Sequence, residues 1–169
     1  MRPIRRHKVV DRRKALGKVL FRNGAESASI SLVNRTQLQI LSEERARDAE
    51  ALLNVGRWSG AFYLAGYAIE CGLKACIARL TSQYDFPDKS FVSKSYTHDI
   101  EELVKLAGLG LQREADIKAN PLLGNNWQII KDWNEVARYQ CWTELHARKL
   151  VSAVTDTTNG VLPWIRIHW

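Results

Sequence analysis

The sequence lacks the motifs of several common site classes. Its three cysteines, Cys71, Cys76 and Cys141, form no CxxC pair, and it has no HExxH motif and no Asp/Glu-rich loop. We therefore expect no metal site and no bound cofactor. The glycines between residues 58 and 82 fall inside a helical pattern, which excludes a glycine-rich phosphate loop between a strand and a helix. An odd cysteine count without a secretory signal is typical of free thiols in a reducing compartment.

The chain also lacks a long apolar run. Its least charged stretch, residues 58–69, is twelve residues long and ends before Glu70, whereas a membrane span needs about 20 apolar residues. The basic N-terminus has no apolar segment like that of a signal peptide. We therefore expect a cytoplasmic protein that does not associate with membranes. Period-two alternation of useful length is absent as well, so no β-sheet is predicted.

The positive charge is concentrated near the N-terminus. The net charge is +7, but residues 1–35 contain ten Lys or Arg and two acids, whereas residues 36–169 contain 15 basic and 16 acidic residues. We predict that residues 1–35 form a basic N-terminal extension, and four interpretations of it stay open. It is a mobile tail, a basic arm on nucleic acid, an organelle transit peptide, or a stretch ahead of a true start near Val33.

Helical periodicity begins after this extension. Thr36 and Gln39 have the spacing of a capping box, and apolar residues recur at helical spacing from there to Gly56, a C-terminal stop. Residues 58–82 are apolar nearly all round, which predicts a central, buried helix. One stripe of this helix is small, so a neighbouring helix can approach closely. The small stripe consists of Ala61, Ala65, Ala68, Gly72 and Ala75.

The rest of the chain is predicted to be helical apart from one loop. Thr97 is expected to cap a helix that Gly108 ends. The predicted segments are a loop at 83–96, helices at 97–108, 112–119 and 126–139, and a last helix from Thr143. The buried face of the last helix is predicted to consist of Ala147, Leu150, Val151 and Val154. The fold class is therefore all-α, an up-and-down helical bundle of about five helices at 36–169.

Two charged residues lie inside the apolar central helix. Glu70 and Lys74 are one turn apart, in the favourable order for an ion pair, and share a face with Tyr63 and Tyr67. Leaving either charge buried and unpaired would cost on the order of 3–5 kcal/mol, so each needs a partner or a wet cleft. A core ion pair and a polar pocket both fit this pattern. We predict that Lys74 or Arg138 contacts Glu70, since an Arg fork can bind both carboxylate oxygens.

A histidine and an aspartate stand at the start of a predicted helix. His98 beside Asp99 could act as a general base or bind a metal. The structural alternative is that this pair caps the helix and packs the histidine ring against it.

Four phrases occur in the order in which a known family has them. LAGYAIECGLKA resembles the central helix of prokaryotic HEPN domains, and THDIEELVKLAG resembles their His-Asp helix start. WQIIKDWNEVARY is similar to their Trp-containing helix that ends in Arg-Tyr, and IRIHW to their common C-terminus. The resemblance covers roughly residues 36–169.

The resemblance implies a helical bundle that forms a homodimer within a toxin–antitoxin, defence or nucleotide-related system. It also implies a small nucleotidyltransferase as partner and RNA or a nucleotide as ligand. Some HEPN proteins are metal-independent ribonucleases, in which a closely spaced Arg and His act on the phosphate and on the 2′-hydroxyl.

This chain departs from the ribonuclease pattern. Arg138 is the candidate arginine, but seven residues separate it from the next histidine, His146. On one continuous helix the two side chains would lie about 80° apart and ~12 Å along the axis, too far apart for one phosphate. A break at 140–143 would change that geometry. A polar cleft is expected from Glu70, Lys74, His98, Asp99 and Tyr139.

Two functions therefore stand against each other. The favoured one is a dimeric HEPN module that binds a nucleotide, RNA or a partner protein and has no intact Arg/His ribonuclease motif. The alternative is a metal-independent endoribonuclease toxin with a displaced site at Arg138 and His146. A purely structural helical subunit is a third interpretation of the same residues.

Overall fold

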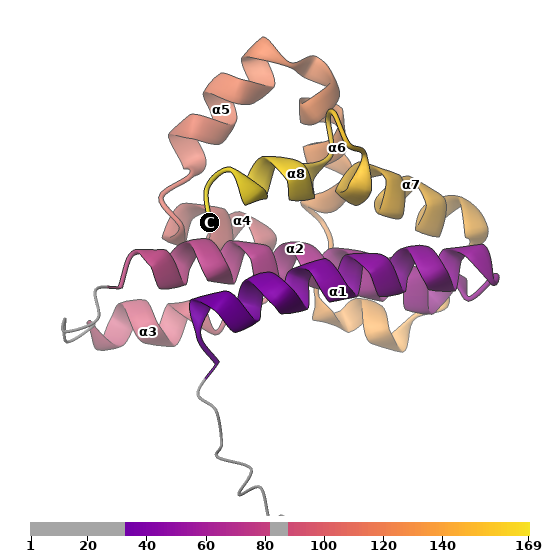
Figure 1. Cartoon of the computed structure of the whole chain (residues 1–169), viewed down its shortest axis with the longest axis horizontal. Helices are drawn as coiled ribbons and strands as arrows, with labels where there is room; N and C mark the ends of the chain where they lie inside the picture. Colours follow the sequence, from indigo (N-terminus) through magenta and orange to yellow (C-terminus); the bar gives the residue numbers. More distant parts are fainter. Residues whose placement is uncertain (1–32, 82–87) are drawn as a thin grey trace, which may run out of the picture. The chain divides into compact units, whose positions relative to one another are not determined.

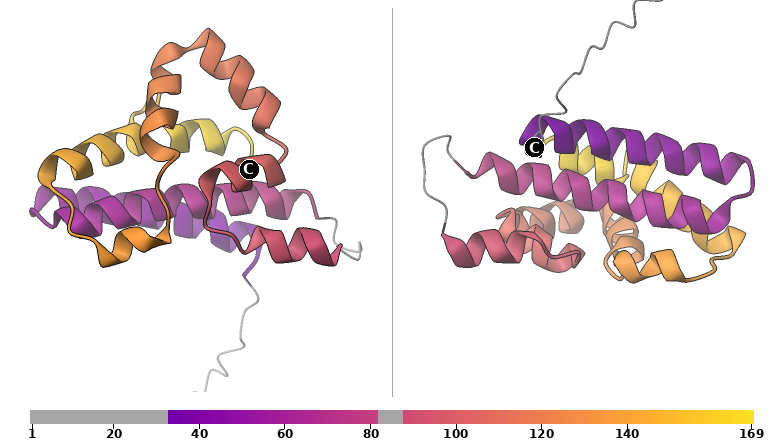
Figure 2. Two further views of the ribbon diagram at one scale, coloured as in Figure 1. Left: turned by 180° about the vertical axis from the view of Figure 1, so that it is seen from behind. Right: turned by 90° about the horizontal axis from the view of Figure 1, so that it is seen from below.

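The longest helices of the protein form an antiparallel hairpin. The computed structural model describes residues 33–81 and 88–169, and all regular secondary structure among them is helical, as predicted. Helix α1 (Arg35–Asn54) turns through Gly56, at φ +74°, into α2 (Trp58–Arg79), and the two run side by side in both views of Figure 2. The predicted extension at 1–35 lies, apart from its last three residues, outside the described part of the chain.

Small residues allow α1 and α2 to approach closely. The predicted small stripe of α2 is fully buried, and Ala46 and Ala49 of α1 are buried with it. The Ser42 hydroxyl donates a 2.6 Å hydrogen bond to the Ala68 carbonyl oxygen across this contact. A Cβ on Gly72 would stand 3.2 Å from the Ser42 oxygen, so a larger residue there would push the helices apart.

The first helix begins two residues earlier than the capping-box prediction placed it. Asn34, not Thr36, is the N-cap: its side-chain oxygen accepts a 3.0 Å hydrogen bond from the Gln37 amide, and the Gln37 side chain accepts one from the Asn34 amide. The box at Thr36 and Gln39 is therefore wrong. Asn caps at least as well as Thr, so the earlier of two competing sites is used.

The remaining helices pack on the central helix and on one another (Figure 1). Helices α4, α7, α8 and the 3₁₀ helix η1 all contact α2, which explains why α2 is buried nearly all round. The predicted buried face of the last long helix is confirmed at all four positions. These elements are α3 (Lys89–Ser95), α4 (Ile100–Leu106), α5 (Gly110–Ala119), α6 (Pro121–Ile130), η1 (Glu135–Tyr139), α7 (Glu144–Thr155) and α8 (Val161–Arg166).

Two parts of the predicted helix pattern are wrong. Residues 89–95, within a predicted loop, form the short helix α3, which the Asp88 side chain caps. The predicted helix at 126–139 does not exist as one unit: α6 starts at Pro121, where proline suits the first helical position, and ends at Ile130. The chain then breaks, and Asn134 caps η1 by accepting a 3.0 Å hydrogen bond from the Val136 amide.

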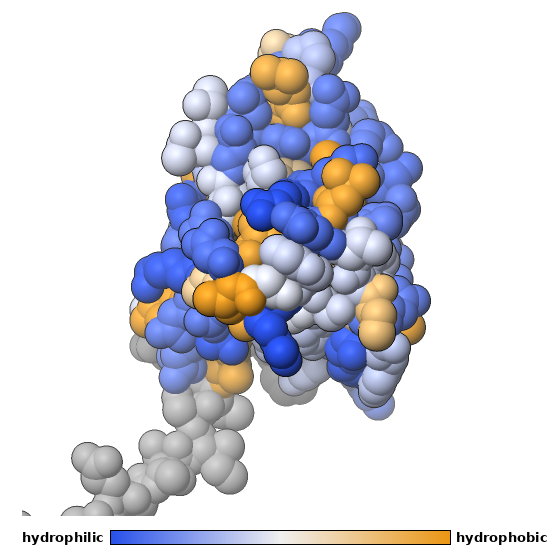
Figure 3. All heavy atoms as spheres, turned by 90° about the vertical axis from the view of Figure 1, so that its right-hand side faces the viewer, coloured by the Kyte–Doolittle hydropathy of each residue, from blue (hydrophilic) through white to orange (hydrophobic). Residues whose placement is uncertain are grey.

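The surface of this helical unit has scattered apolar residues. Helix α2 is long and apolar enough to cross a membrane by length and composition, but 67% of its most apolar window is buried inside the protein. Figure 3 shows one end of the unit, where hydrophobic residues are separated by hydrophilic ones. They do not merge there into one broad apolar face.

Candidate polar site around Glu70 and His98

Glu70 is the only carboxylate among the described residues that the fold buries. It lies in the middle of α2 with 2% of its surface exposed. Lys74, one helical turn later, donates to it: the Lys74 Nζ and Glu70 Oε1 are 2.8 Å apart. The prediction that Lys74 or Arg138 contacts Glu70 is therefore confirmed through Lys74. The ion pair offsets part of the desolvation cost of the carboxylate but leaves its second oxygen to be satisfied.

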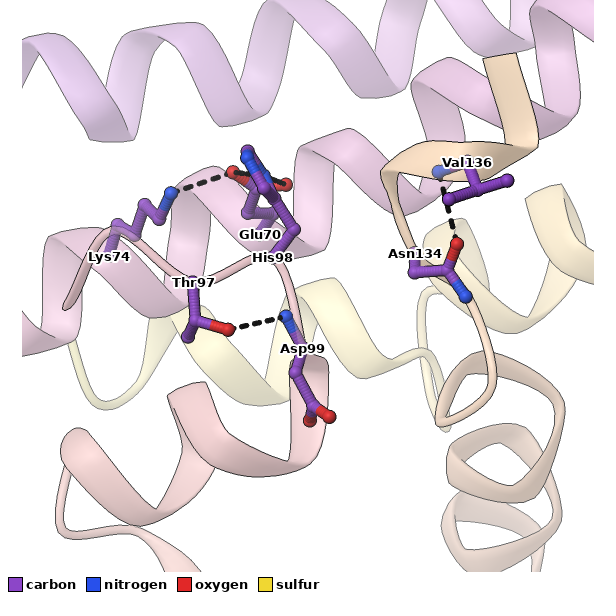
Figure 4. Close-up of polar contacts among 7 residues, drawn as sticks. All are labelled: Glu70, Lys74, Thr97, His98, Asp99, Asn134 and Val136. Atoms are coloured by element: carbon purple, nitrogen blue, oxygen red, sulfur yellow. Dashed lines mark hydrogen bonds and ion pairs between the residues drawn. The ribbon is translucent and has the colours of Figure 1, made fainter. Parts of the chain in front are cut away.

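His98, from the segment just before α4, makes the other hydrogen bonds to the Glu70 carboxylate (Figure 4). Its Nδ1 lies 2.9 Å from Glu70 Oε1 and 3.0 Å from Glu70 Oε2. A carboxylate only accepts hydrogen bonds, so Nδ1 is the protonated nitrogen that donates. The His98 side chain is 42% exposed, and its other nitrogen, Nε2, is not used by Glu70. Glu70 thus fixes both the tautomer and the orientation of a half-exposed imidazole.

The neighbours of His98 form the start of α4. The Asp99 side chain accepts a 2.9 Å hydrogen bond from the Glu102 amide and is the N-cap, so the expectation that Thr97 caps this helix is wrong. The Thr97 hydroxyl instead accepts a 3.1 Å hydrogen bond from the Asp99 amide. Asp99 is therefore a structural cap, whereas His98, the residue before it, turns back to α2.

A tyrosine and a cysteine of α2 lie beside the buried charge. Burial, aided by the nearby Cys71 and Glu70, raises the pKa of Tyr67 to about 12. Burial and the Glu70 charge likewise raise the pKa of Cys71 to about 12. Both groups therefore stay protonated and neutral near pH 7, and neither is activated as a nucleophile.

Arg138 lies beside Tyr63, which comes seven residues before Glu70 on α2. The neighbouring Tyr139 and Tyr63 side chains raise the pKa of Arg138 above its usual value. Its guanidinium carbon lies 4.9 Å from the centre of the Tyr139 ring. Tyr63 stacks on Tyr67 at 6.1 Å. We call the row Tyr63, Tyr67, Glu70 and Lys74 the polar stripe of α2; Arg138 and His98 contact it at two different points.

A cleft of about 620 Å³ opens beside His98. It lies between the start of α4 and the segment that links α6 to η1. Its polar groups include three acids and the cation Lys131. The lining residues are Thr97, His98, Asp99, Lys131, Asp132, Trp133, Asn134, Glu135 and Val136.

His146 lies in a different environment. The predicted break at 140–143 exists, because η1 ends at Tyr139 and α7 begins at Glu144. His146 Nδ1 is 2.7 Å from the hydroxyl of Thr143, the N-cap of α7, and its ring meets Trp142 edge-on at 5.6 Å. It lines a pocket of about 460 Å³ of which Arg138 is not a lining residue. The break therefore does not bring Arg138 and His146 into one pocket.

Two structural features of the site were not foreseen from the sequence. The Glu70–His98 contact joins residues 28 positions apart, and no local pattern indicates it. The Trp133 ring lies against Gly66, where a Cβ would overlap it. A glycine inside an otherwise well-packed helix was the available signal for that contact. Across residues 33–81 and 88–169, no group of three or more His, Cys, Asp or Glu side chains is arranged to hold a metal ion.

Comparison of the chain with family models, curated proteins and solved structures gives no match.

Proposed function

We propose that the protein is a cytoplasmic, homodimeric HEPN-type module that binds RNA or nucleotides and lacks an Arg/His ribonuclease centre. In this proposal it belongs to a toxin–antitoxin or defence system and has a small nucleotidyltransferase as partner. The family part of the proposal rests on the four sequence phrases quoted above. The RNA-binding part rests on the polar stripe of α2.

The main support for RNA binding is the placement of Arg138 and His98 at two separate points of the polar stripe. Glu70 orients His98, and Arg138 lies against the Tyr139 ring and beside Tyr63. Tyr63 and Glu70 are seven residues apart on α2, so the groups that hold Arg138 and His98 are spaced by about 10 Å along the helix axis. One phosphate cannot bridge that span, whereas a strand with several phosphates can follow it.

Binding to single-stranded RNA tests this proposal. Fluorescence anisotropy with a labelled RNA of about 12 nucleotides, at low ionic strength, gives the affinity of the full-length chain. Arg138→Ala should weaken binding about tenfold, since a charge-assisted hydrogen bond to a phosphate contributes roughly 1.5 kcal/mol. His98→Gln should weaken binding about fivefold, since the free Nε2 can accept a hydrogen bond from a 2′-hydroxyl and such a bond contributes roughly 1 kcal/mol. Arg148→Ala is the matched control, because Arg148 is exposed on α7 and pairs with Glu144.

All these variants share the basic segment at 1–35, so any RNA affinity of that segment contributes equally to each. Equal binding by the four proteins would assign RNA affinity to charge elsewhere in the chain and contradict the role of the stripe. Absence of binding at low salt would contradict the proposed function itself.

The homodimer and the nucleotidyltransferase partner rest on the family resemblance alone. Light scattering on the purified chain measures the oligomeric state directly. A monomer at micromolar concentration would contradict the dimer. Co-expression with the product of an adjacent nucleotidyltransferase reading frame, followed by co-purification, tests the partner.

A second candidate function is the metal-independent endoribonuclease, and the Glu70–His98 contact is the observation in its favour. A carboxylate that accepts from Nδ1–H leaves Nε2 as a base, which is the arrangement that orients a catalytic imidazole. This geometry favours His98 over His146 as the base. Cleavage of RNA in the presence of a chelator, lost in His98→Ala and kept in His146→Ala, would establish this candidate over the binding module.

A further inference from the structure

A second pocket, separate from the polar stripe, has an aromatic wall. The pocket of about 460 Å³ lies between α2, η1 and the start of α7, within the range of about 300–1,000 Å³ typical of small-molecule sites. Three large rings line it: Phe62 and Trp133, which are buried, and the partly buried Trp142.

This wall is held rigidly in place. Phe62 and Trp142 stack with ring centres 3.7 Å apart and planes 12° apart. Trp142 is fixed further by two hydrogen bonds: its amide donates to the Ser59 hydroxyl at 2.9 Å, and its indole Nε1 donates to the Ala137 carbonyl at 3.2 Å. Trp133 is held against Gly66. A planar ligand would therefore meet a preorganised surface and lose little free energy in ordering it.

The rim of the pocket presents donors from one helix. The Thr143 hydroxyl, which accepts the His146 amide as N-cap, lies 2.7 Å from His146 Nδ1 and is able to donate to it. In the tautomer that accepts this bond, the imidazole carries its proton on Nε2, where it can donate to a ligand. Lys149 follows one turn later on α7 and lines the same pocket. The side chains of Asp132, Asn134 and Gln140 add donors and acceptors to the lining.

We propose that this pocket binds a mononucleotide, with the base against the aromatic wall and the phosphate toward His146 and Lys149. The choice of a nucleotide rests on the proposed function and deepens it. An aromatic wall suits the face of a nucleobase, amide and carboxylate groups suit its polar edge, and a lysine with a histidine donor suits a phosphate.

Isothermal titration of the full-length protein with AMP, UMP, adenosine and inorganic phosphate tests the proposal. We expect saturable binding of at least one mononucleotide, weaker binding of adenosine and weakest binding of phosphate alone. Lys149→Ala should weaken the binding of the mononucleotide by about tenfold or more and leave the affinity for adenosine nearly unchanged. Arg148→Ala is the matched control: it removes a neighbouring exposed cation that does not line the pocket, and it should have no effect.

A variant of the wall makes the test independent of the phosphate contact. Trp142→Leu removes the ring that stacks on Phe62 and should weaken AMP and adenosine alike, by about tenfold or more. Thermal unfolding shows whether Trp142→Leu is folded. If it is not, Phe62→Leu is used as the wall variant in its place. No binding of either mononucleotide, or binding that neither Lys149→Ala nor a folded wall variant weakens, overturns the proposal.

The RNA assay separates this proposal from the proposed function. If RNA binds through Arg138 and His98 while mononucleotides fail to bind, only the pocket proposal is overturned. If mononucleotides bind in the expected order while RNA does not, the pocket proposal is supported and RNA binding by the stripe is overturned. If neither binds, both are overturned.

Discussion

His98 and Glu70 are joined across 28 positions of the chain by one imidazole nitrogen, which lies 2.9 and 3.0 Å from the two carboxylate oxygens. Lys74 contacts the same carboxylate at 2.8 Å. One buried charge therefore connects the central helix to the start of α4. The contact combines a structural task, satisfying the carboxylate, with a chemical one, orienting a half-exposed imidazole.

Glu70→Gln should destabilise the protein by roughly 3 kcal/mol, the lower end of the range for breaking a buried ion pair. The lower end applies because the Lys74 side chain, 20% exposed, can still reach water. Urea unfolding measures the loss. Glu43→Gln is the control: Glu43 accepts two hydrogen bonds from Arg166, but this pair is more exposed and should cost under about 1 kcal/mol. Equal losses in the two variants would contradict the role given to burial.

Gly66→Ala should destabilise the protein by about 1–3 kcal/mol although alanine favours helices. The added methyl group would overlap the Trp133 ring and force it away from α2. Gly60→Ala on the same helix is the comparison, because its Cβ would meet only the end of the flexible Leu52 side chain, at 3.0 Å. In thermal unfolding, the midpoint temperature of Gly60→Ala should be equal to or higher than that of the wild type. A Gly66→Ala variant of unchanged stability would show that the Trp133 ring has room to move.

Two residues at the start of α1 distinguish the observed cap from the predicted one. Asn34→Ala should cost about 1 kcal/mol, because it leaves the Gln37 amide without its acceptor. Thr36→Ala should leave stability unchanged or raise it slightly, since alanine is the better helix former at a non-capping position. Chemical denaturation of both variants measures the difference. The reverse order would restore the capping box at Thr36 and Gln39.

Stability should fall as the pH rises above about 9. Burial raises the pKa of Cys71 to about 12 and that of Cys76 to about 11, from an ordinary value of 9.0. Above pH 9 the unfolded chain releases these thiol protons while the folded protein keeps them. The unfolded state is therefore stabilised relative to the folded state as the pH rises. Each thiol contributes a loss of up to about 1.4 kcal/mol per pH unit until its folded pKa is reached.

Urea unfolding from about pH 8 to about pH 10.5 measures this decline. Replacing both thiols in a Cys71→Ala, Cys76→Ala variant should make the curve flatter, whatever the stability of that variant at neutral pH. The exposed Cys141 offers the control, since Cys141→Ala should leave the slope unchanged. A slope that the double variant keeps would assign the alkaline loss to other groups.

The parts of the fold that were predictable depend on local periodicity. The small stripe of α2 and the buried face of α7 follow from apolar spacing within one helix, and both are found as expected. The break after Ile130 was missed because Trp133 continues the apolar pattern of α6, although it is buried by a contact with Gly66 on another helix. The spacing of apolar residues in the sequence indicates that Trp133 is buried, but it does not indicate which helix it packs against.

Of the five residues expected to form a polar cleft, only His98 and Asp99 line the cleft that the structure has, whereas Glu70, Lys74 and Tyr139 do not. The sequence singled out Glu70 and Lys74 because charges in an apolar helix need partners, and His98 because it stands beside Asp99 at the start of a predicted helix. Which partner comes from outside α2 depends on how α4 packs, and only the folded chain determines that. Two exchanges of role illustrate this: Asp99 caps where Thr97 was expected to, and His98 satisfies the carboxylate where Arg138 was considered.

The Trp133 ring forms part of both cavities, the cleft beside His98 and the aromatic pocket beside His146. Gly66 lies directly behind this ring, and a Cβ there would overlap it, so the ring has little room to shift toward α2. A ligand in either cavity would therefore meet the same fixed indole, and a substitution of Trp133 would alter the lining of both cavities at once.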